Sequence, residues 1–297
     1  MNKVRRYRLS DLEVSKLNLT ANKHNRYRLS TEQERELLKM RSNQYKIKRL
    51  FFDIETSPNI VYSWRIGYNL SITPDNIIDE RKIICISYKW EDEDKIYTLT
   101  WDKDQCDKQM LIDFIAQANK ADELIAHNGD RFDIKWIRTR CIYHRIPMFP
   151  NYKTLDTLKK AKSGFNFNSN KLDYIAKFLG VGAKVKHSGF DMWVQVMKGN
   201  HLAMQEMIEY CEGDIIVLED IFLTMQNYIK MNTHNGVINN NLKYSCPSCG
   251  GEHPTLLKNN VTAMGTIKRL MECNDCNYTY EISNSSYLNL LKFNNLI

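Results

Sequence analysis

The feature that most constrains this chain is Leu50-Phe51-Phe52-Asp53-Ile54-Glu55-Thr56, a short apolar run that ends in two carboxylates. Its aromatic and β-branched residues favour a buried strand, and Ser57-Pro58-Asn59 places a loop at its end. Because side chains alternate along a strand, Asp53 and Glu55 lie on the same face. Two carboxylates that point the same way repel each other, and a bound Mg²⁺ or Mn²⁺ is the usual remedy. Asp-x-Glu alone is weak evidence, so the rest of the chain decides.

The composition is that of a globular protein, with 297 residues, 43% of them hydrophobic and 26% charged. This length allows one sizeable core and a smaller module, or two domains. No apolar run reaches the length of a membrane span, and the first residues lead into no signal-peptide core. We therefore expect no membrane association and a cytoplasmic location, in a bacterium or in the cytosol of a phage-infected host. The eight cysteines are then thiols or metal ligands, not disulfides.

Positive charge is concentrated at the start of the chain. Residues 1–49 contain fourteen lysines and arginines against five acids, whereas the whole chain has a net charge of +7. An excess confined to one arm favours a polyanionic partner, nucleic acid first; the alternative is a solvated basic tail. The arm also repeats Arg-Tyr-Arg-Leu-Ser at 6–10 and 26–30, and Ser30 begins a capping-box pattern. The pattern predicts short basic helices that follow a phosphate backbone or dock another protein.

The central part of the chain has the pattern of an α/β domain. Residues 83–90, 95–101 and 123–127 favour strands, and residues 108–118, 134–142, 171–179 and 202–229 have helical periodicity. Strands in a meander, followed by strands that alternate with helices, predict a mixed sheet flanked by helices. The aromatic stretch 61–68 either packs as a hairpin or stacks on unpaired bases near the carboxylates.

The C-terminal part has the pattern of a zinc ribbon. Residues 233–241 are polar and rich in Asn, which is typical of a linker, and two Cys-x-x-Cys motifs follow. Cys246, Cys249, Cys273 and Cys276 predict one tetrahedral structural Zn²⁺, with no open position for catalysis. The resulting division is a basic helical arm (1–47), an α/β domain (48–231), a linker (232–242) and a zinc-ribbon module (243–297).

Three motifs in the α/β domain resemble those of the DEDD superfamily of 3′–5′ exonucleases, which have a ribonuclease H-like fold. Phe52-Asp53-Ile54-Glu55-Thr56 resembles the first motif, residues 127–133 (His-Asn-Gly-Asp-Arg-Phe-Asp) the second, and residues 210–214 (Tyr-Cys-Glu-Gly-Asp) the third. The third is similar to the tyrosine branch, because Glu209 occupies the position of the alternative histidine. Lys171 opens a segment similar to one in family B polymerase proofreading domains, and the chain also resembles stand-alone phage and bacterial members of that group.

The resemblance implies roles for nine residues. Asp53 would bridge two Mg²⁺ or Mn²⁺ ions, Glu55 and Asp214 would hold the ion that activates water, and Asp133 would support the other. Tyr210 would orient the attacking water, since a phenol with the ordinary pKa of about 10 is protonated at neutral pH. Thr56 and Lys171 would contact the substrate strand, although exposed lysines are common. Asn128 and Phe132 either contact the terminal nucleotide or support the motif.

The resemblance therefore implies a metal-dependent 3′–5′ exonuclease on single-stranded or frayed nucleic acid, with DNA preferred to RNA. A separate polymerase or another replication protein would be its partner. Two alternatives stay open at this point. One is a structure-specific or RNA-directed nuclease on the same fold, since fold alone does not determine the substrate. The other is a non-catalytic module that binds nucleic acid or a protein partner.

Overall fold

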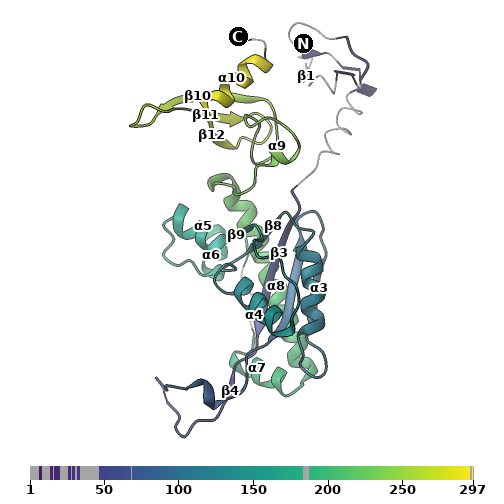
Figure 1. Ribbon diagram of the computed structural model, residues 1–297, viewed down its shortest axis with the longest axis vertical. Coiled ribbons are helices and arrows are strands. Elements are labelled where there is room, and N and C mark those ends of the chain that lie inside the picture. Colours follow the sequence, from purple (N-terminus) through teal and green to yellow (C-terminus); the bar gives the residue numbers. More distant parts are fainter. Residues whose placement is uncertain are drawn as a thin grey trace. The chain divides into compact units, whose positions relative to one another are not determined.

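The computed structural model describes residues 47–182 except 68, residues 187–296 except 295, and short parts of the first 46 residues (7–8, 14–15, 17–20, 26–27, 29–30 and 32–33). The chain divides into two compact units (Figure 1). One consists of residues 47–232, and the other contains residues 1–46 and 233–297. Among the helices described, none combines the length and the apolar character that a membrane span requires.

A mixed five-stranded sheet forms the centre of the unit 47–232, as the sequence predicts. Its strand order is β7-β6-β3-β8-β9. The central strand β3 is antiparallel to β6 and parallel to β8, and β9 is parallel to β8. The two neighbours of β3 therefore lie on opposite sides of its carboxylates. The bounds are β3 Arg49–Thr56, β6 Ile83–Trp90, β7 Ile96–Thr100, β8 Glu123–Ala126 and β9 Thr154–Asp156.

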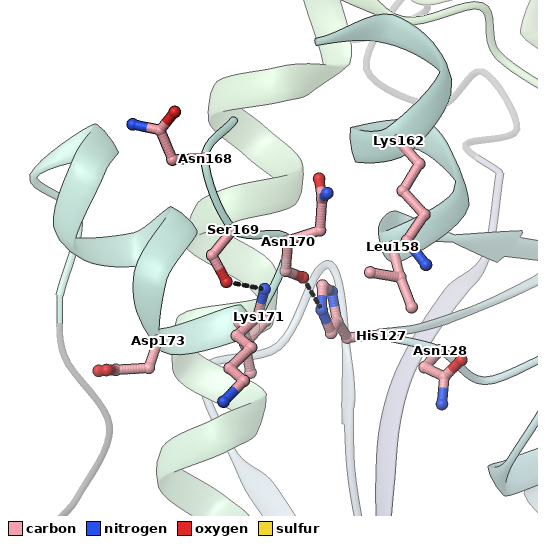
Figure 2. Close-up of a pocket in the computed structure, with 10 residues that line it drawn as sticks. His127, Asn128, Leu158, Lys162, Asn168, Ser169, Asn170, Lys171 and Asp173 are labelled. Atoms are coloured by element: carbon pink, nitrogen blue, oxygen red, sulfur yellow. Dashed lines mark hydrogen bonds between the residues drawn. The ribbon is translucent and has the colours of Figure 1, made fainter. Parts of the chain in front are cut away.

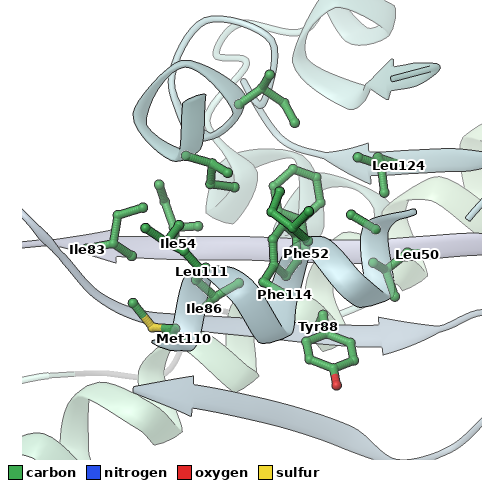
Figure 3. Close-up of a cluster of buried hydrophobic side chains, with 14 of the residues drawn as sticks. Leu50, Phe52, Ile54, Ile83, Ile86, Tyr88, Met110, Leu111, Phe114 and Leu124 are labelled. Atoms are coloured by element: carbon green, nitrogen blue, oxygen red, sulfur yellow. The ribbon is translucent and has the colours of Figure 1, made fainter. Parts of the chain in front are cut away.

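Alternation along β3 sends its side chains to two different helix layers. Phe52 and Ile54 belong to the hydrophobic cluster formed with α3 (Lys108–Ala118) and α4 (Asp133–His144), which Figure 3 shows. Phe51 points to the other face, where its ring lies 5.5 Å from that of Phe222 on α8 (His201–Met225). Asp53 and Glu55 follow Phe51 in this alternation, so they face α8.

Shorter elements complete this unit. They include the helices α5 (Thr157–Gly164), α6 (Leu172–Leu179) and α7 (Phe190–Met197), of which only α6 is predicted by the periodicity. The hairpin considered for residues 61–68 has its second strand farther along the chain, because β4 (Ile60–Val61) pairs with β5 (Ile77–Asp79). The 3-10 helix η1 (Pro74–Asn76) comes before β5, and a second, η2 (Gln226–Tyr228), follows α8. Two of the aromatic residues between β4 and β5 do not pack into the core, since Tyr62 is 74% exposed and Trp64 is fully exposed.

A buried ionic cluster joins the start of β6 to α4. Asp107 is fully buried, and it accepts hydrogen bonds from the Ile83 backbone N–H (3.0 Å), Arg140 Nε (2.7 Å) and His144 Nε2 (2.7 Å). Burial alone would raise the pKa of Asp107, but the bonds from Arg140, Ile83 and His144 outweigh it and lower that pKa. The cluster therefore holds α4, and with it Asp133, at a defined position against the sheet.

The C-terminal residues form a small antiparallel sheet of β10 (Pro254–Val261), β11 (Ile267–Cys273) and β12 (Thr279–Ser283), followed by α10 (Asn284–Phe293). The segment expected to be a linker is part of this fold. It contains α9 (Asn235–Ile238), and the side chains of Asn235 and Asn241 donate to the carbonyls of Ser248 and Gly250 in the first Cys-x-x-Cys motif. The Asn-rich composition thus reflects amide hydrogen bonds to a tight turn.

The two N-terminal repeats form short strands, which the sequence pattern did not predict. Tyr7–Arg8 (β1) pairs antiparallel with Arg26–Tyr27 (β2), so the two copies of the repeat pair with each other. The predicted capping box is present, because the Ser30 hydroxyl accepts from Gln33 N–H while the Gln33 side chain accepts from Ser30 N–H. The helix expected over 34–40 lies outside the described residues.

Candidate functional site

Asp53 and Glu55 lie half-buried on the face of β3 that meets α8. Cys211 of α8 contacts Asp53, with its Sγ 3.7 Å from both the backbone oxygen and Oδ2 of that residue. The pKa of Cys211 is raised well above its ordinary value by a hydrogen bond with Cys85, by burial, and by the charges of Asp53 and Glu55. Cys211 is therefore a neutral thiol that can donate to the Asp53 carboxylate.

Asp133 is the first residue of α4 and is only 2% exposed. The backbone N–H groups of Ile54 and of Asp133 itself donate to its carboxyl group, which places that group directly beside β3 between Asp53 and Glu55. The pKa of Asp133 is raised to about 7, chiefly by burial and to a smaller extent by the nearby charge of Asp156, while the two backbone hydrogen bonds oppose the shift. Its Oδ1 is buried with no hydrogen-bond partner among the described residues.

The loop before Asp133 has a conformation that its residues explain. Asn128 has a φ of 69°, in the left-handed region that Asn tolerates. A Cβ at Gly129 would lie 2.5 Å from the Cβ of Ala126, so no larger residue fits there without movement. Asp156, at the end of β9, accepts from the backbone N–H groups of Asn128 and Asp130 and also caps α5. Asp156 thus fixes the loop that delivers Asp133.

Tyr210 and Asp214 lie one turn apart on α8, on either side of the contact between Cys211 and Asp53. Asp214 is 4% exposed and belongs to the buried face of the helix. Tyr210 is half-buried, and its ring centroid lies 4.6 Å from that of His187 and 6.4 Å from that of Trp193. The backbone N–H and hydroxyl of Ser188 both donate to Glu206 of α8, which secures His187 above Tyr210. The structure therefore brings the five residues expected to be catalytic to one region around β3.

The carboxylates around β3 are candidate ligands for a divalent cation. Asp133 Oδ1 is a buried acceptor without a hydrogen-bond donor among the described residues. The pKa of Asp133 is raised because burial destabilises the charged carboxylate, and a bound cation would offset this effect. Within the described residues, no three of the four acids place ligand atoms within 4.8 Å of one another.

Two of the residues expected to bind substrate lie in one cavity. Asn128 and Lys171 line a space of about 750 Å³ next to the loop that ends at Asp133 (Figure 2). His127 forms its wall and is held on both sides, by Thr157 Oγ1 at Nδ1 and by the Asn170 carbonyl at Nε2, each at 2.9 Å. Lys162 and Lys171 line the same cavity, which therefore suits an anionic, polar ligand.

The other two residues expected to bind substrate lie elsewhere. Thr56 lines a second, smaller cavity together with Glu55. Phe132 lines neither of these cavities, and it packs against the hydrophobic cluster of β3, α3 and α4. Of the two roles left open for Phe132, its position favours support of the motif.

Sequence reasoning missed three residues that shape the site. Asp156 had a local signal, because an Asp before a helical segment is a typical N-cap. His187 and Trp193, which surround Tyr210, had none, since they come close to it only through the packing of α7 on α8.

The four C-terminal cysteines form a compact group whose sulfur atoms all lie within 4.8 Å of one another. Cys249 Sγ is 3.5 Å from Cys273 Sγ, and Cys246 Sγ is 3.7 Å from Cys276 Sγ. The backbone N–H groups of Ser248, Gly251 and Asp275 each point at a cysteine sulfur at 3.4 Å. Four sulfurs at such spacings, with amide donors that favour thiolates, are compatible with one Zn²⁺.

Comparison with known proteins supports the fold. The model of the family described as the RNase_H superfamily matches residues 77–226, which include Asp133, Tyr210 and Asp214 and begin after Asp53 and Glu55. Among solved structures, the chain is similar to the family B DNA polymerase from the hyperthermophilic archaeon Pyrobaculum calidifontis, with a TM-score of 0.49 and 13% identity. The similarity covers 62% of this chain and 25% of the polymerase, so the chain matches about a quarter of that protein. No curated protein sequence matches the chain.

Proposed function

The chain belongs to the RNase H superfamily, and we propose that it is a metal-dependent 3′–5′ exonuclease of the DEDD tyrosine branch. Its substrate in this proposal is single-stranded or frayed nucleic acid, DNA first. The observation that carries the proposal is the arrangement around β3. Asp53 and Glu55 face α8, Asp133 accepts the Ile54 N–H, and Cys211, between Tyr210 and Asp214, contacts Asp53.

The side chains around β3 have different roles in the proposed hydrolysis. Asp53, Glu55, Asp133 and Asp214 would hold two divalent cations, which supply an activated water and shield the negative charge that develops on the phosphate. Tyr210 orients the attacking water through its hydroxyl, and the rings of His187 and Trp193 limit its movement. Cys211 of α8 donates to Asp53 of β3 and so restrains the Asp53 carboxylate.

The second unit has a separate role in the proposal. Cys246, Cys249, Cys273 and Cys276 hold one structural Zn²⁺ that stabilises the C-terminal sheet. The basic N-terminal residues contact the phosphate backbone, and the protein acts with a polymerase on another chain. The distance between sulfurs and the charge of the N-terminal residues support these assignments.

End-labelled oligonucleotides test the proposed function. The full-length protein is incubated with single- and double-stranded DNA and RNA, in Mg²⁺ or in EDTA, beside the variants Asp53→Ala and Asp94→Ala. Asp94 is an exposed acid in the turn after β6, so its variant is the matched control. We expect a ladder from the 3′ end that requires Mg²⁺ and is lost only in Asp53→Ala. Internal cuts would indicate a structure-specific nuclease, and binding without cleavage would contradict the proposal.

A further inference from the structure

A second cavity, of about 340 Å³, lies beside Glu55 and has no role in the proposal above. Its walls come from the end of β3, from the residue pair before β6, and from α7. They consist of residues 55–58, Arg81, Phe190 and Trp193. The strand order places this cavity on the β6 side of β3, whereas the cavity with Asn128 and Lys171 lies on the β8 side. The carboxylates of β3 lie between the two.

The aromatic wall of this cavity is exposed on one side and anchored on the other. Phe190 is 68% exposed, an unfavourable position for a large apolar side chain without a ligand. Trp193 packs against the buried cluster of β6, α7 and α8, and its ring meets that of Tyr210 at 72°. A planar base could stack on this wall without disturbing the core, as bases do on exposed aromatic side chains of proteins that bind single strands.

Arg81 supplies the charge that such a ligand requires. Its backbone N–H donates to the Asn59 side chain, and its guanidinium lies 5.2 Å from the centroid of the Trp136 ring. Its Nε is buried without a hydrogen-bond partner among the described residues. Because Arg81 is only half-buried and lines the cavity, a guanidinium held in place by a ring is well suited there to a phosphate oxygen.

We propose that the cavity of Arg81, Phe190 and Trp193 is a nucleotide subsite: it binds the nucleotide on one side of the hydrolysed phosphodiester, with the base on Phe190 and the adjoining phosphate on Arg81. The cavity of Asn128 and Lys171 then takes the nucleotide on the other side. This inference rests on the proposed nuclease function, because a phosphodiester between two nucleotides needs a binding site on each side of the catalytic carboxylates.

Binding without cleavage tests the subsite. The affinity of the full-length protein for a short, 5′-labelled single-stranded oligonucleotide is measured by fluorescence anisotropy in EDTA, and an abasic residue is placed in turn at each position near the 3′ end. Phe190→Ala should weaken binding by about 5- to 150-fold, the range for losing one stacked base. In the wild type, an abasic residue at one particular position should weaken binding by the same factor. In Phe190→Ala, an abasic residue at that position should weaken binding no further.

Phe149→Ala is the matched control, since Phe149 is a 56% exposed aromatic residue that lines a different cavity. It should leave the affinity unchanged. Arg81→Gln should reduce the slope of log affinity against log salt by about 0.7, the value for one phosphate contact on a single strand, and Arg81→Lys should keep the slope. Thermal melts check that each variant is folded.

The outcomes separate the subsite from the nuclease. The subsite is wrong if Phe190→Ala binds the oligonucleotide within twofold of the wild-type affinity, or if the wild type binds no oligonucleotide. It is also wrong if the affinity that Phe190→Ala loses relative to the wild type is the same for every abasic position. If the oligonucleotide binds with the predicted position dependence but is never cleaved in Mg²⁺, the subsite is supported and the nuclease function is refuted.

Discussion

The two candidate metal sites of this protein are built in opposite ways. The cysteine cluster comes from two short motifs within 31 residues, and its four sulfurs already lie within 4.8 Å of one another. The acid cluster comes from β3, α4 and α8, which are separated by up to 161 residues of sequence, and its members are wider apart. Local turns therefore position the cysteines, whereas a large hydrophobic core positions the acids. In the proposed assignment, metal would stabilise the fold at the cysteine site and take part in the chemistry at the acid site.

The largest effect that this comparison predicts is the loss of the C-terminal fold without zinc. Structural Zn²⁺ contributes about 10–16 kcal/mol in zinc-finger peptides, and a module this small has little other core. Cys273→Ser should therefore unfold the residues after about 232, as seen by limited proteolysis and zinc analysis. Cleavage of short oligonucleotides should change by less than about threefold. Loss of all activity, with residues 47–232 still folded, would show that the comparison is wrong.

The acid cluster should show the reverse behaviour. Asp53→Ala should lower the cleavage rate by about 1,000-fold or more, because loss of a bridging ligand removes several kcal/mol of transition-state stabilisation. The melting temperature in EDTA should stay the same or rise slightly, since one carboxylate of a repelling set has been removed. Rate assays and thermal melts check both. Activity within tenfold of wild type would exclude Asp53 from the site.

Tyr210 tests whether the third motif is assigned correctly. Tyr210→Phe keeps the ring contacts with His187 and Trp193 but removes the hydroxyl that orients water. We expect turnover to fall by about 10- to 1,000-fold, with little change in Mn²⁺ affinity. Turnover is measured in single-turnover assays and Mn²⁺ affinity by calorimetry. An unchanged rate would exclude Tyr210 from the chemistry.

The smallest effect concerns the pH dependence of stability without metal. The folded pKa of Asp133 is about 7, above the ordinary value of about 4, so the folded state binds this proton more tightly than the unfolded state. Stability should therefore fall between about pH 4 and pH 7 by a few kcal/mol and stay lower above that range.

Asp133→Asn cannot ionise and should avoid this loss. In EDTA at pH 8 its melting temperature should exceed that of the wild type by several degrees, and at pH 4 the two should agree. Melting curves of both proteins across this range provide the measurement. A variant that is less stable than the wild type at pH 8 would mean that the Asp133 carboxylate is stabilised by its surroundings.

The parts of the structure that could be predicted are those with strong local patterns. Alternation in residues 50–56 placed Asp53 and Glu55 on one face, and the apolar stripe of residues 202–229 predicted the long helix that carries Asp214. The parts that could not be predicted depend on distant contacts. The helix α7 has only eight residues, and its N-cap residue is Gly189, which has no side chain to cap the helix. No local pattern therefore predicted that Trp193 would lie beside Tyr210.

Errors arose where composition was used in place of contacts. The Asn-rich segment was interpreted as a linker because polar residues without periodicity usually are, yet Asn235 and Asn241 donate to the turn of the first cysteine motif. The sequence analysis predicted helices after the repeats of the basic arm but missed the pairing of the repeats with each other, in which Tyr7 lies opposite Tyr27. In both cases, the deciding partner lies too far along the chain for a local pattern to show it.

Anomalous diffraction from crystals grown with Zn²⁺ and soaked in Mn²⁺ tests the central claim most directly, because it locates each metal by its own absorption edge. We predict one zinc peak among Cys246, Cys249, Cys273 and Cys276, and two manganese peaks about 3.5–4 Å apart among Asp53, Glu55, Asp133 and Asp214. Manganese peaks elsewhere, or none near Asp53 in a crystal that shows the zinc, would contradict the assignment of these acids as the catalytic centre.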